Sequence, residues 1–317
     1  MTDLKRTKPM IKRLEFSAFF ILLLVFTGKI YAQQEQSFAH FMFQPVVFNP
    51  AVVGNESNIQ LNSLIRQQWV GLKGAPETYV FNIHAPISFL AGGVGATIIK
   101  DQIGPFNSTG LKIAYSYGID FWQGNLKFGL SAGLINKSID YGYFNVQDDP
   151  ILAGSENESG MIFNLDAGIF YEVKDQYYFG ISSTQLNQGK MILEAGSTSL
   201  KRNIYLHGGY YFELRQIPKM LFHSSAMAVY TSASPLQINL GFVAEYNKKF
   251  WGGVTYKHQS AIGIMTGIFF KQFIASYAYE INLTPLKNGG SHELMLGYRF
   301  IIEIERGNKS YKNTRYL

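Results

Sequence analysis

Histidine and serine side chains are the residues in this chain most able to carry chemistry, but their spacing does not match the common sites. No two histidines have the HxxH or HExxH spacing that places two metal ligands on one helix face. The six histidines are His40, His84, His207, His223, His258 and His292. Ser291 and His292 are adjacent, so in a strand their side chains would point to opposite faces. We therefore predict no catalytic residue, no metal site and no cofactor. An outer-membrane lipase that uses this Ser–His pair is the weakest alternative.

Composition also limits the chemistry. The chain has 317 residues and no cysteine, so it cannot form a disulfide, a thiolate nucleophile or a lipid-anchored cysteine. Apolar residues make up 47%, aromatic residues 15% and charged residues only 16%, against a charged share of about a quarter in soluble domains. This balance is typical of strands with one apolar face and aromatic girdles.

The first 32 residues have the pattern of a secretory signal peptide. Basic residues between Lys5 and Arg13 precede an apolar run from Phe16 to Phe26, and Ala32 supplies a small residue for cleavage. The apolar run has 11 residues, too few for a membrane-spanning helix of about 20 residues. After residue 32 the chain has 22 basic and 20 acidic residues. This near-neutral balance excludes the basic surface that nucleic-acid binding needs.

From about residue 58 onward, apolar and polar residues alternate. The stretches 126–134, 163–169, 236–242 and 294–300 show this period of two clearly, which indicates strands with one apolar and one polar face. We predict about fourteen strands, at 58–68, 78–86, 91–101, 108–121, 125–140, 160–173, 176–186, 201–213, 219–231, 235–246, 250–257, 261–270, 273–282 and 291–300.

Strand length and connections favour a membrane barrel over a soluble β-sandwich. Many predicted strands reach ten residues or more, close to the 9–11 that cross a bilayer obliquely. Tight turns near 121–125, 174–175, 215–218, 247–249 and 271–272 alternate with long links at 141–159, 187–200 and 282–290. Outer-membrane barrels place short turns in the periplasm and long loops outside. The sequence therefore predicts an all-β, antiparallel, up-and-down transmembrane barrel over residues 58–300.

The stretch before and around the first strand contains the most distinctive motifs. Residues 41–54 read FMFQPVVFNPAVVG, residues 64–78 read LIRQQWVGLKGAPET, and residues 83–86 read IHAP. These motifs, in this order, and the ending SHELMLGYRF at 291–300 resemble the PorP/SprF family. That family comprises outer-membrane proteins of Bacteroidetes associated with type IX secretion and gliding motility.

The resemblance suggests which residues matter. Physical reasoning points the same way: Asn49, Pro50 and Gly54 favour a turn into the first strand, Arg66 is costly toward lipid and should face the lumen or a partner, and Trp69 fits an interfacial anchor. The candidate motif or partner-binding residues are Asn49, Pro50, Gly54, Arg66, Gln68, Trp69, Gly71, Gly74, Ala75 and Pro76. A purely structural role for them, in closing the barrel, is the alternative.

The same resemblance implies a non-enzymatic barrel in the outer membrane. It would help a particular secreted or surface protein to cross that membrane or stay attached to it. Its partners would be type IX secretion components, the C-terminal sorting domain of the large cargo protein, and outer-membrane lipid. A channel for small solutes is the main alternative. Residues 33–57 would lie in the periplasm or the lumen, and residues 301–317 would form a periplasmic tail that binds a partner or stays disordered.

Overall fold

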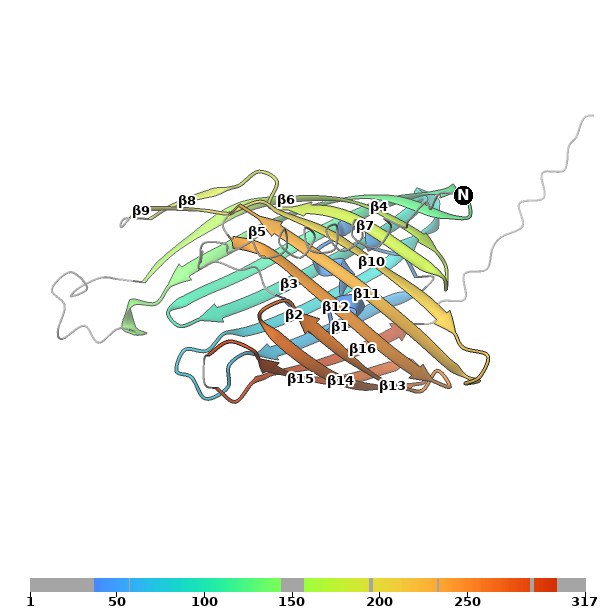
Figure 1. Ribbon diagram of the computed structural model, residues 1–317. Helices are drawn as coiled ribbons and strands as arrows, with labels where there is room; N and C mark the ends of the chain where they lie inside the picture. The colour runs from blue at the N-terminus through green and yellow to red at the C-terminus, as the bar shows by residue number, and fades with distance from the viewer. Residues whose placement is uncertain are drawn as a thin grey trace, which may run out of the picture.

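The computed structural model is a closed β-barrel whose axis runs across the view in Figure 1. The structure describes residues 37–56, 58–143, 157–193, 196–232, 234–285 and 288–300. The expected signal peptide, residues 1–32, and the expected tail, residues 301–317, both lie outside the described residues. Within the described part of the chain, no helix is long and apolar enough to cross a membrane.

Fourteen antiparallel strands form the wall, and β1 pairs with β16 to close it. This confirms the predicted fold class and strand number. The wall strands are β1 (Ile59–Gln67), β2 (Glu77–Ile87), β3 (Gly92–Ile103), β4 (Phe106–Phe121), β5 (Gly124–Ile139), β6 (Glu158–Val173), β7 (Tyr177–Thr184), β10 (Asn203–Glu213), β11 (Met220–Thr231), β12 (Ser234–Tyr246), β13 (Phe250–Lys257), β14 (Ala261–Phe270), β15 (Phe273–Asn282) and β16 (Ser291–Phe300).

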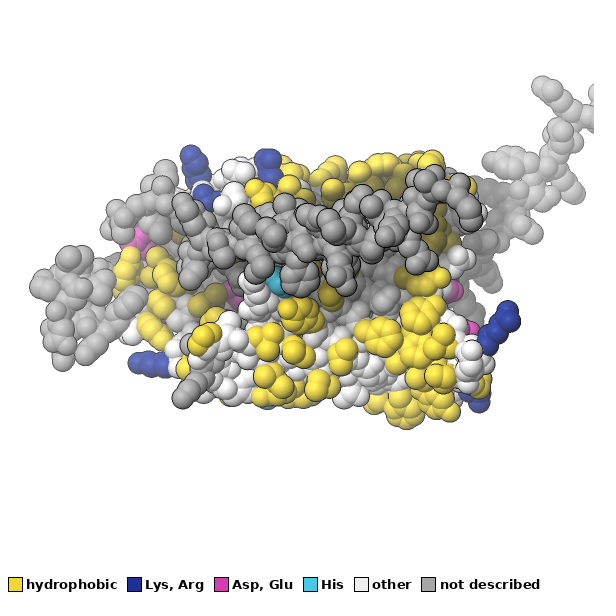
Figure 2. Space-filling model, in the orientation of Figure 1, with side chains coloured by type: hydrophobic (Ala, Val, Ile, Leu, Met, Phe, Trp, Pro, Cys, Tyr) yellow, Lys and Arg dark blue, Asp and Glu magenta, His cyan; other side chains and the backbone are white. Residues whose placement is uncertain are grey.

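The alternation in the sequence becomes the two faces of the wall. Along β14, Ile262, Ile264 and Ile268 are exposed on the outside, whereas Ala261 and Met265 are buried on the inside. Figure 2 shows hydrophobic side chains spread over the visible outer face, with most lysines and arginines toward its two ends. An apolar outer band of this kind suits contact with lipid.

The connections divide between the two ends of the barrel. One end carries only short connections, such as 122–123 between β4 and β5 and 271–272 between β14 and β15. The other end carries the long links after β1, β5, β7 and β15, together with short turns such as 104–105. In Figure 1 the long links lie to the left and the tight turns to the right. By the usual rule we expect the tight-turn end to be periplasmic, and we call the opposite end the outer end.

The link after β7 contains a small hairpin that the sequence pattern did not predict. It consists of β8 (Lys190–Leu193) and β9 (Gly196–Ser199), which pair only with each other. Met191 packs with Ile162 of β6 and with Leu200 in a small buried cluster. The hairpin therefore attaches to the rim of the wall without joining the barrel.

The chain before β1 lies inside the barrel. It contains three single-turn 3₁₀ helices, η1 (Phe41–Phe43), η2 (Pro45–Val47) and η3 (Pro50–Val52), and most of its side chains from Phe38 to Gly54 are buried. We call residues 37–56 the luminal segment. Its apolar residues form the main core of the molecule together with inward side chains of the wall, such as Tyr205, Met227 and Trp251.

Candidate functional site: the filled lumen

The luminal segment runs from one end of the lumen to the other. At its start, the carbonyl of Ser37 accepts a hydrogen bond of 2.8 Å from Lys257 Nζ, and Lys257 is the last residue of β13, at the outer end. Near its finish, the carbonyl of Gly54 accepts from Lys127 Nζ at 3.0 Å, in the half of the barrel near the tight turns. The segment thus begins near the outer end and ends toward the tight-turn end, where β1 begins.

Asn49 and Pro50 form the centre of this segment. Pro50 begins η3, and the Asn49 side chain caps it by accepting from the amide of Ala51 at 3.0 Å. The Asn49 amide group also donates to the carbonyl of Ile169 at 3.2 Å and lies 3.0 Å from His207 Nε2. Asn49 is fully buried, and a buried amide is stable only when it is hydrogen-bonded in this way. This residue therefore joins the turn to the wall.

Gly54 occupies a position that only glycine fits well. Its φ is +64°, and an added Cβ would lie 2.5 Å from Gly93 Cα and 2.7 Å from the carbonyl oxygen of Ala85. The left-handed conformation is costly for other residues. Gly54 thus lies in a turn just before β1, where the backbone of the segment is pressed against the wall.

A buried cluster of charges anchors the outer end of the segment. Arg66 points into the lumen, where it forms ion pairs with Glu293 and with Glu280, the latter at 2.6 Å. Lys257 pairs with Glu280 at 2.6 Å. All four side chains are 4% exposed or less. Two cations balance two anions, as a buried site requires.

Glu293 connects this cluster to the luminal segment. It accepts hydrogen bonds from the backbone amides of Ala39 at 2.7 Å and His40 at 3.1 Å, and it lies 2.8 Å from His40 Nδ1. His40 Nε2 lies 3.1 Å from the Ser276 hydroxyl. If Nδ1 carries the proton and donates to Glu293, Nε2 is free to accept from Ser276, so one neutral tautomer satisfies both contacts.

The remaining motif residues form the loop between β1 and β2 at the outer end. The amide of Gln68 donates to the carbonyl of Pro76 at 2.9 Å, and the amide of Ala75 donates to that of Leu72 at 3.3 Å. Trp69, Gly71 and Gly74 have positive φ, so the loop is tightly folded.

This loop also contacts its neighbours at the outer end. Val70 exchanges two backbone hydrogen bonds with the β15–β16 link, through Gly289 and Gly290, at 2.7 and 2.9 Å. The amide of Gly104 donates to Gly74 at 3.0 Å. The motif residues thus fall into two groups, one inside the lumen and one in an ordered external loop.

Hydrolase and metal chemistry receive no geometric support. Contrary to the expectation that no serine spacing matches a common site, residues Gly129 to Gly133 have the GxSxG spacing of serine hydrolases. They lie in the middle of β5 and not in the strand-to-helix turn that such enzymes use. Ser131 donates to Asp166 at 2.9 Å. Among the described residues, no three histidine or acidic side chains are grouped to hold a metal ion.

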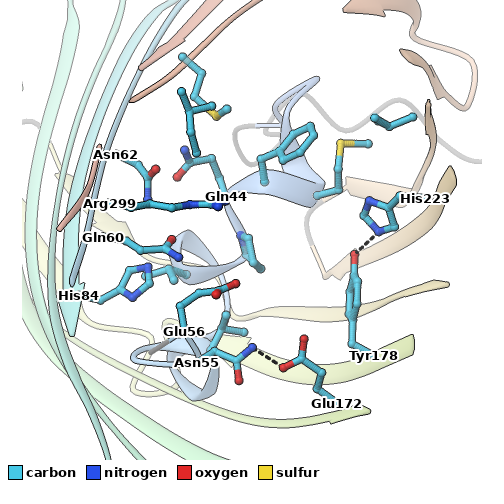
Figure 3. A pocket seen from close by; sticks show the side chains of 18 of the residues that line it. Gln44, Asn55, Glu56, Gln60, Asn62, His84, Glu172, Tyr178, His223 and Arg299 are labelled. Atoms are coloured by element: carbon cyan, nitrogen blue, oxygen red, sulfur yellow. Dashed lines mark hydrogen bonds between the residues drawn. The ribbon is translucent and has the colours of Figure 1, made fainter. Parts of the chain in front are cut away.

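A cavity of about 240 Å³ remains between the luminal segment and the wall. We call it the vestibule. Most of its wall residues lie near the strand ends that meet the tight turns, so it occupies the tight-turn half of the lumen. Figure 3 shows Asn62 and Arg299 on one side, Tyr178 and His223 on the other, and Gln44 of the luminal segment between them. The labelled polar lining residues are Gln44, Asn55, Glu56, Gln60, Asn62, His84, Glu172, Tyr178, His223 and Arg299.

Sequence reasoning missed most partners of the luminal segment. We did not predict three charged partners, Glu280, Glu293 and Lys257. A signal was present, because an acidic or basic residue within an alternating strand indicates a side chain that avoids lipid. Wall glycines that make room for the segment were also missed. An added Cβ at Gly129 would lie 2.2 Å from the backbone nitrogen of Ala51, a contact that spacing alone cannot reveal.

Comparison with known protein families identifies one family whose pattern this sequence matches. The family described as type IX secretion system membrane protein PorP/SprF matches residues 30–298. No curated protein sequence gives a significant match.

Solved structures share the fold. The chain is similar to the monoaromatic hydrocarbon channel CymD, with 12% identity and a TM-score of 0.52 over 84% of this chain and 93% of that one. It is also similar to the P. putida toluene transporter TodX, with 12% identity and a TM-score of 0.49 over 81% and 94%. Omp33 of Acinetobacter baumannii has 10% identity and a TM-score of 0.47 over 78% and 100%. At these identities the likeness is one of barrel fold alone.

Proposed function

Because this chain belongs to the PorP/SprF family of type IX secretion system membrane proteins, we propose that it assists one particular large protein to cross the outer membrane or to remain attached there. It acts by binding and carries out no bond chemistry. Its partners are other components of the secretion machinery and the C-terminal sorting domain of the cargo. Its apolar outer face contacts the lipid of the outer membrane.

The observation that carries this proposal is the filled lumen. Ala39, His40, Asn49, Ala51 and Val53 are fully buried along the length of the luminal segment. A water-filled diffusion path would leave such residues accessible. A barrel closed in this way is better suited to present binding surfaces than to conduct a solute or a chain.

The external loop between β1 and β2 supplies one such surface. Gly71 and Lys73 are exposed, and the hydrogen bonds from Val70 and Gly74 to neighbouring links hold the loop in one shape. A pre-ordered loop loses little conformational entropy when it binds. In this proposal, the motif residues of the loop shape the surface for a partner; they are Gln68, Trp69, Gly71, Gly74, Ala75 and Pro76. The motif residues inside the barrel keep the lumen closed; they are Asn49, Pro50, Gly54 and Arg66.

Deletion of the gene, followed by mass spectrometry of surface-exposed and released proteins, tests the proposal. The expected result is loss of one or a few large proteins from both fractions, with the other secreted proteins unchanged. Re-expression of the unaltered chain should restore them. An unchanged set of secreted proteins, combined with altered uptake of a small solute, would overturn the proposal.

A solute channel is the second candidate, and the vestibule is the observation that favours it. A cavity that opens toward one end of a barrel could be the inner part of a solute path. In this structure the path stops at the luminal segment, where Gln44 and Val52 line the cavity. The channel therefore requires movement of that segment, which the binding role does not.

A further inference from the structure

The vestibule is open at the periplasmic end and closed at the other. Glu56 and Arg299 are exposed and mark its open rim, whereas Gln44 and Trp251 are buried at 2% and lie deeper. The luminal segment separates this space from the outer end. A ligand must therefore enter from the periplasm and can penetrate only a short way. This geometry suits the end of a chain better than its middle.

One side of the vestibule offers unused hydrogen-bond donors. The Arg299 guanidinium lies 5.7 Å from the centre of the Phe269 ring, and it forms no ion pair with any residue that the structure describes. The Gln44 side chain accepts from Asn82 Nδ2 at 2.8 Å, but its own Nε2 has no partner within the described structure. Figure 3 shows both side chains directed into the cavity. The Gln44 amide is a buried donor without a partner, which is costly, and the exposed Arg299 adds a positive charge beside it. This side is therefore complementary to an anion with acceptor oxygens.

An apolar surface lies beside these donors. Phe43 packs against Trp251 with ring centres 4.6 Å apart, and Phe269, Ile274 and Met295 line the same cavity. An apolar group next to a carboxylate would thus find a matching surface. Guanidinium and amide donors are the usual ligands of a carboxylate.

The opposite side of the vestibule is lined by hydrogen-bonding groups of a different kind. Glu172 accepts from Asn55 Nδ2 at 2.5 Å, and the Tyr178 hydroxyl lies 3.2 Å from His223 Nε2. Glu56 lines the cavity as well, and so does Glu245, which is near enough to Arg299 to interact with it electrostatically. These carboxylates can accept from backbone amides or from a basic side chain. An alkyl chain would leave them without partners, whereas a polypeptide would use them.

From these contacts we propose that the vestibule binds the C-terminal end of a polypeptide presented from the periplasm. The terminal carboxylate lies against Arg299 and the Gln44 amide, and the last side chain is apolar and packs on Phe43 and Phe269. The backbone before it faces the carboxylate-lined side. This inference deepens the proposed function, because it assigns a site to the protein partner expected there.

Binding of a defined peptide to the purified full-length protein tests the site. The probe is a fluorescent octapeptide of alternating serine and alanine that ends in leucine with a free carboxylate. The matched control is the same peptide with an amidated C-terminus. We expect saturable binding of the free acid and at least about tenfold weaker binding of the amide, since a charge-assisted contact is lost. Arg299→Gln should abolish this difference.

A matched variant controls for general charge and folding. Lys219→Gln removes one positive charge at the same end of the barrel, in the turn between β10 and β11, from an exposed position that does not line the vestibule. It should leave the preference for the free acid unchanged. Intrinsic tryptophan fluorescence verifies that both variants are folded.

Three results would overturn the inference. The first is equal binding of acid and amide peptides. The second is displacement of the peptide by palmitate with higher affinity and the same dependence on Arg299, which would make this a fatty-acid site. The third is preferential binding of a peptide with the sequence of residues 301–317, which would assign the site to the chain's own end. Acid preference with unchanged secretion after gene deletion would overturn the proposed function and leave the site intact.

Discussion

At the scale of single residues, charges hold the luminal segment at one end and close backbone packing holds it at the other. Glu293 is the central residue of the outer anchor, because it binds Arg66 of the wall and the amides of Ala39 and His40 at once. A carboxylate with this many donors needs no solvent. These shared contacts also make the cluster sensitive to substitution, because removal of one charge leaves another charge buried without its partner.

We therefore expect Arg66→Met and Glu293→Gln each to lower the free energy of unfolding by about 3 kcal/mol or more. The double variant should lose less free energy of unfolding than the two single variants lose in sum, because neither Arg66 nor Glu293 then remains buried without its partner. Chemical unfolding in detergent, followed by tryptophan fluorescence, measures all three. Lys248→Gln, on an exposed turn, should change stability by less than about 0.5 kcal/mol. Strict additivity would show that the ion pair does not couple the two residues.

Gly54 leads to a second prediction at this scale. Gly54→Ala should destabilise the fold by about 2 kcal/mol or more, because alanine disfavours a φ of +64° and its Cβ would meet the backbone of Gly93 at 2.5 Å. Gly110→Ala is the matched control, since the nearest atom to its new Cβ is 3.5 Å away on Ile135. The same unfolding assay applies. Equal stability of the two variants would mean that the segment does not press against β3 there.

At the scale of elements, the wall and the luminal segment differ in how far sequence reasoning could predict them. Alternation predicted the wall strands well, because each strand places every second side chain in lipid and the pattern is local. The short helices η1 to η3 have no such period. Their position depends on partners more than 200 residues away, such as Glu293 for His40. The sequence therefore left open whether residues 33–57 lie in the lumen or the periplasm.

The residues of the candidate site also differ in how far the sequence could predict them. Arg66 was expected to avoid lipid, because a charge in an outward position is costly, and it faces the lumen. Gln44 drew no attention, because a glutamine in an irregular stretch carries no positional signal. The hairpin of β8 and β9 was missed because each strand has only four residues and pairs only with the other.

We also expect the luminal segment to determine conductance. Unaltered protein in a planar bilayer should show no steady ion current, since residues 37–56 fill the lumen. Glu293→Gln should produce transient openings, because it weakens the outer anchor while the wall strands remain paired. Lys248→Gln should stay closed. A steady current through the unaltered protein would show that the lumen is open and would favour the solute channel over the binding role.

At the scale of the whole molecule, the orientation in the membrane decides what each surface can meet. The vestibule opens at the end with tight turns, and the β1–β2 loop lies at the opposite end. If tight turns are periplasmic, the vestibule meets partners before export and the loop meets partners at the cell surface. The chain lacks cysteine, so single introduced thiols can report this orientation without background.

We expect Lys73→Cys, in the exposed β1–β2 loop, to react on intact cells with a maleimide coupled to a polymer too large to cross the outer membrane. The side chain of Trp122, in the tight turn between β4 and β5, is 86% exposed. The second variant is therefore Trp122→Cys. It should react only after the outer membrane is permeabilised. Both sites are accessible in the isolated protein, so a difference on cells reports the side of the membrane and not burial. The reverse labelling would place the vestibule outside, and a polypeptide end could then reach it only after export.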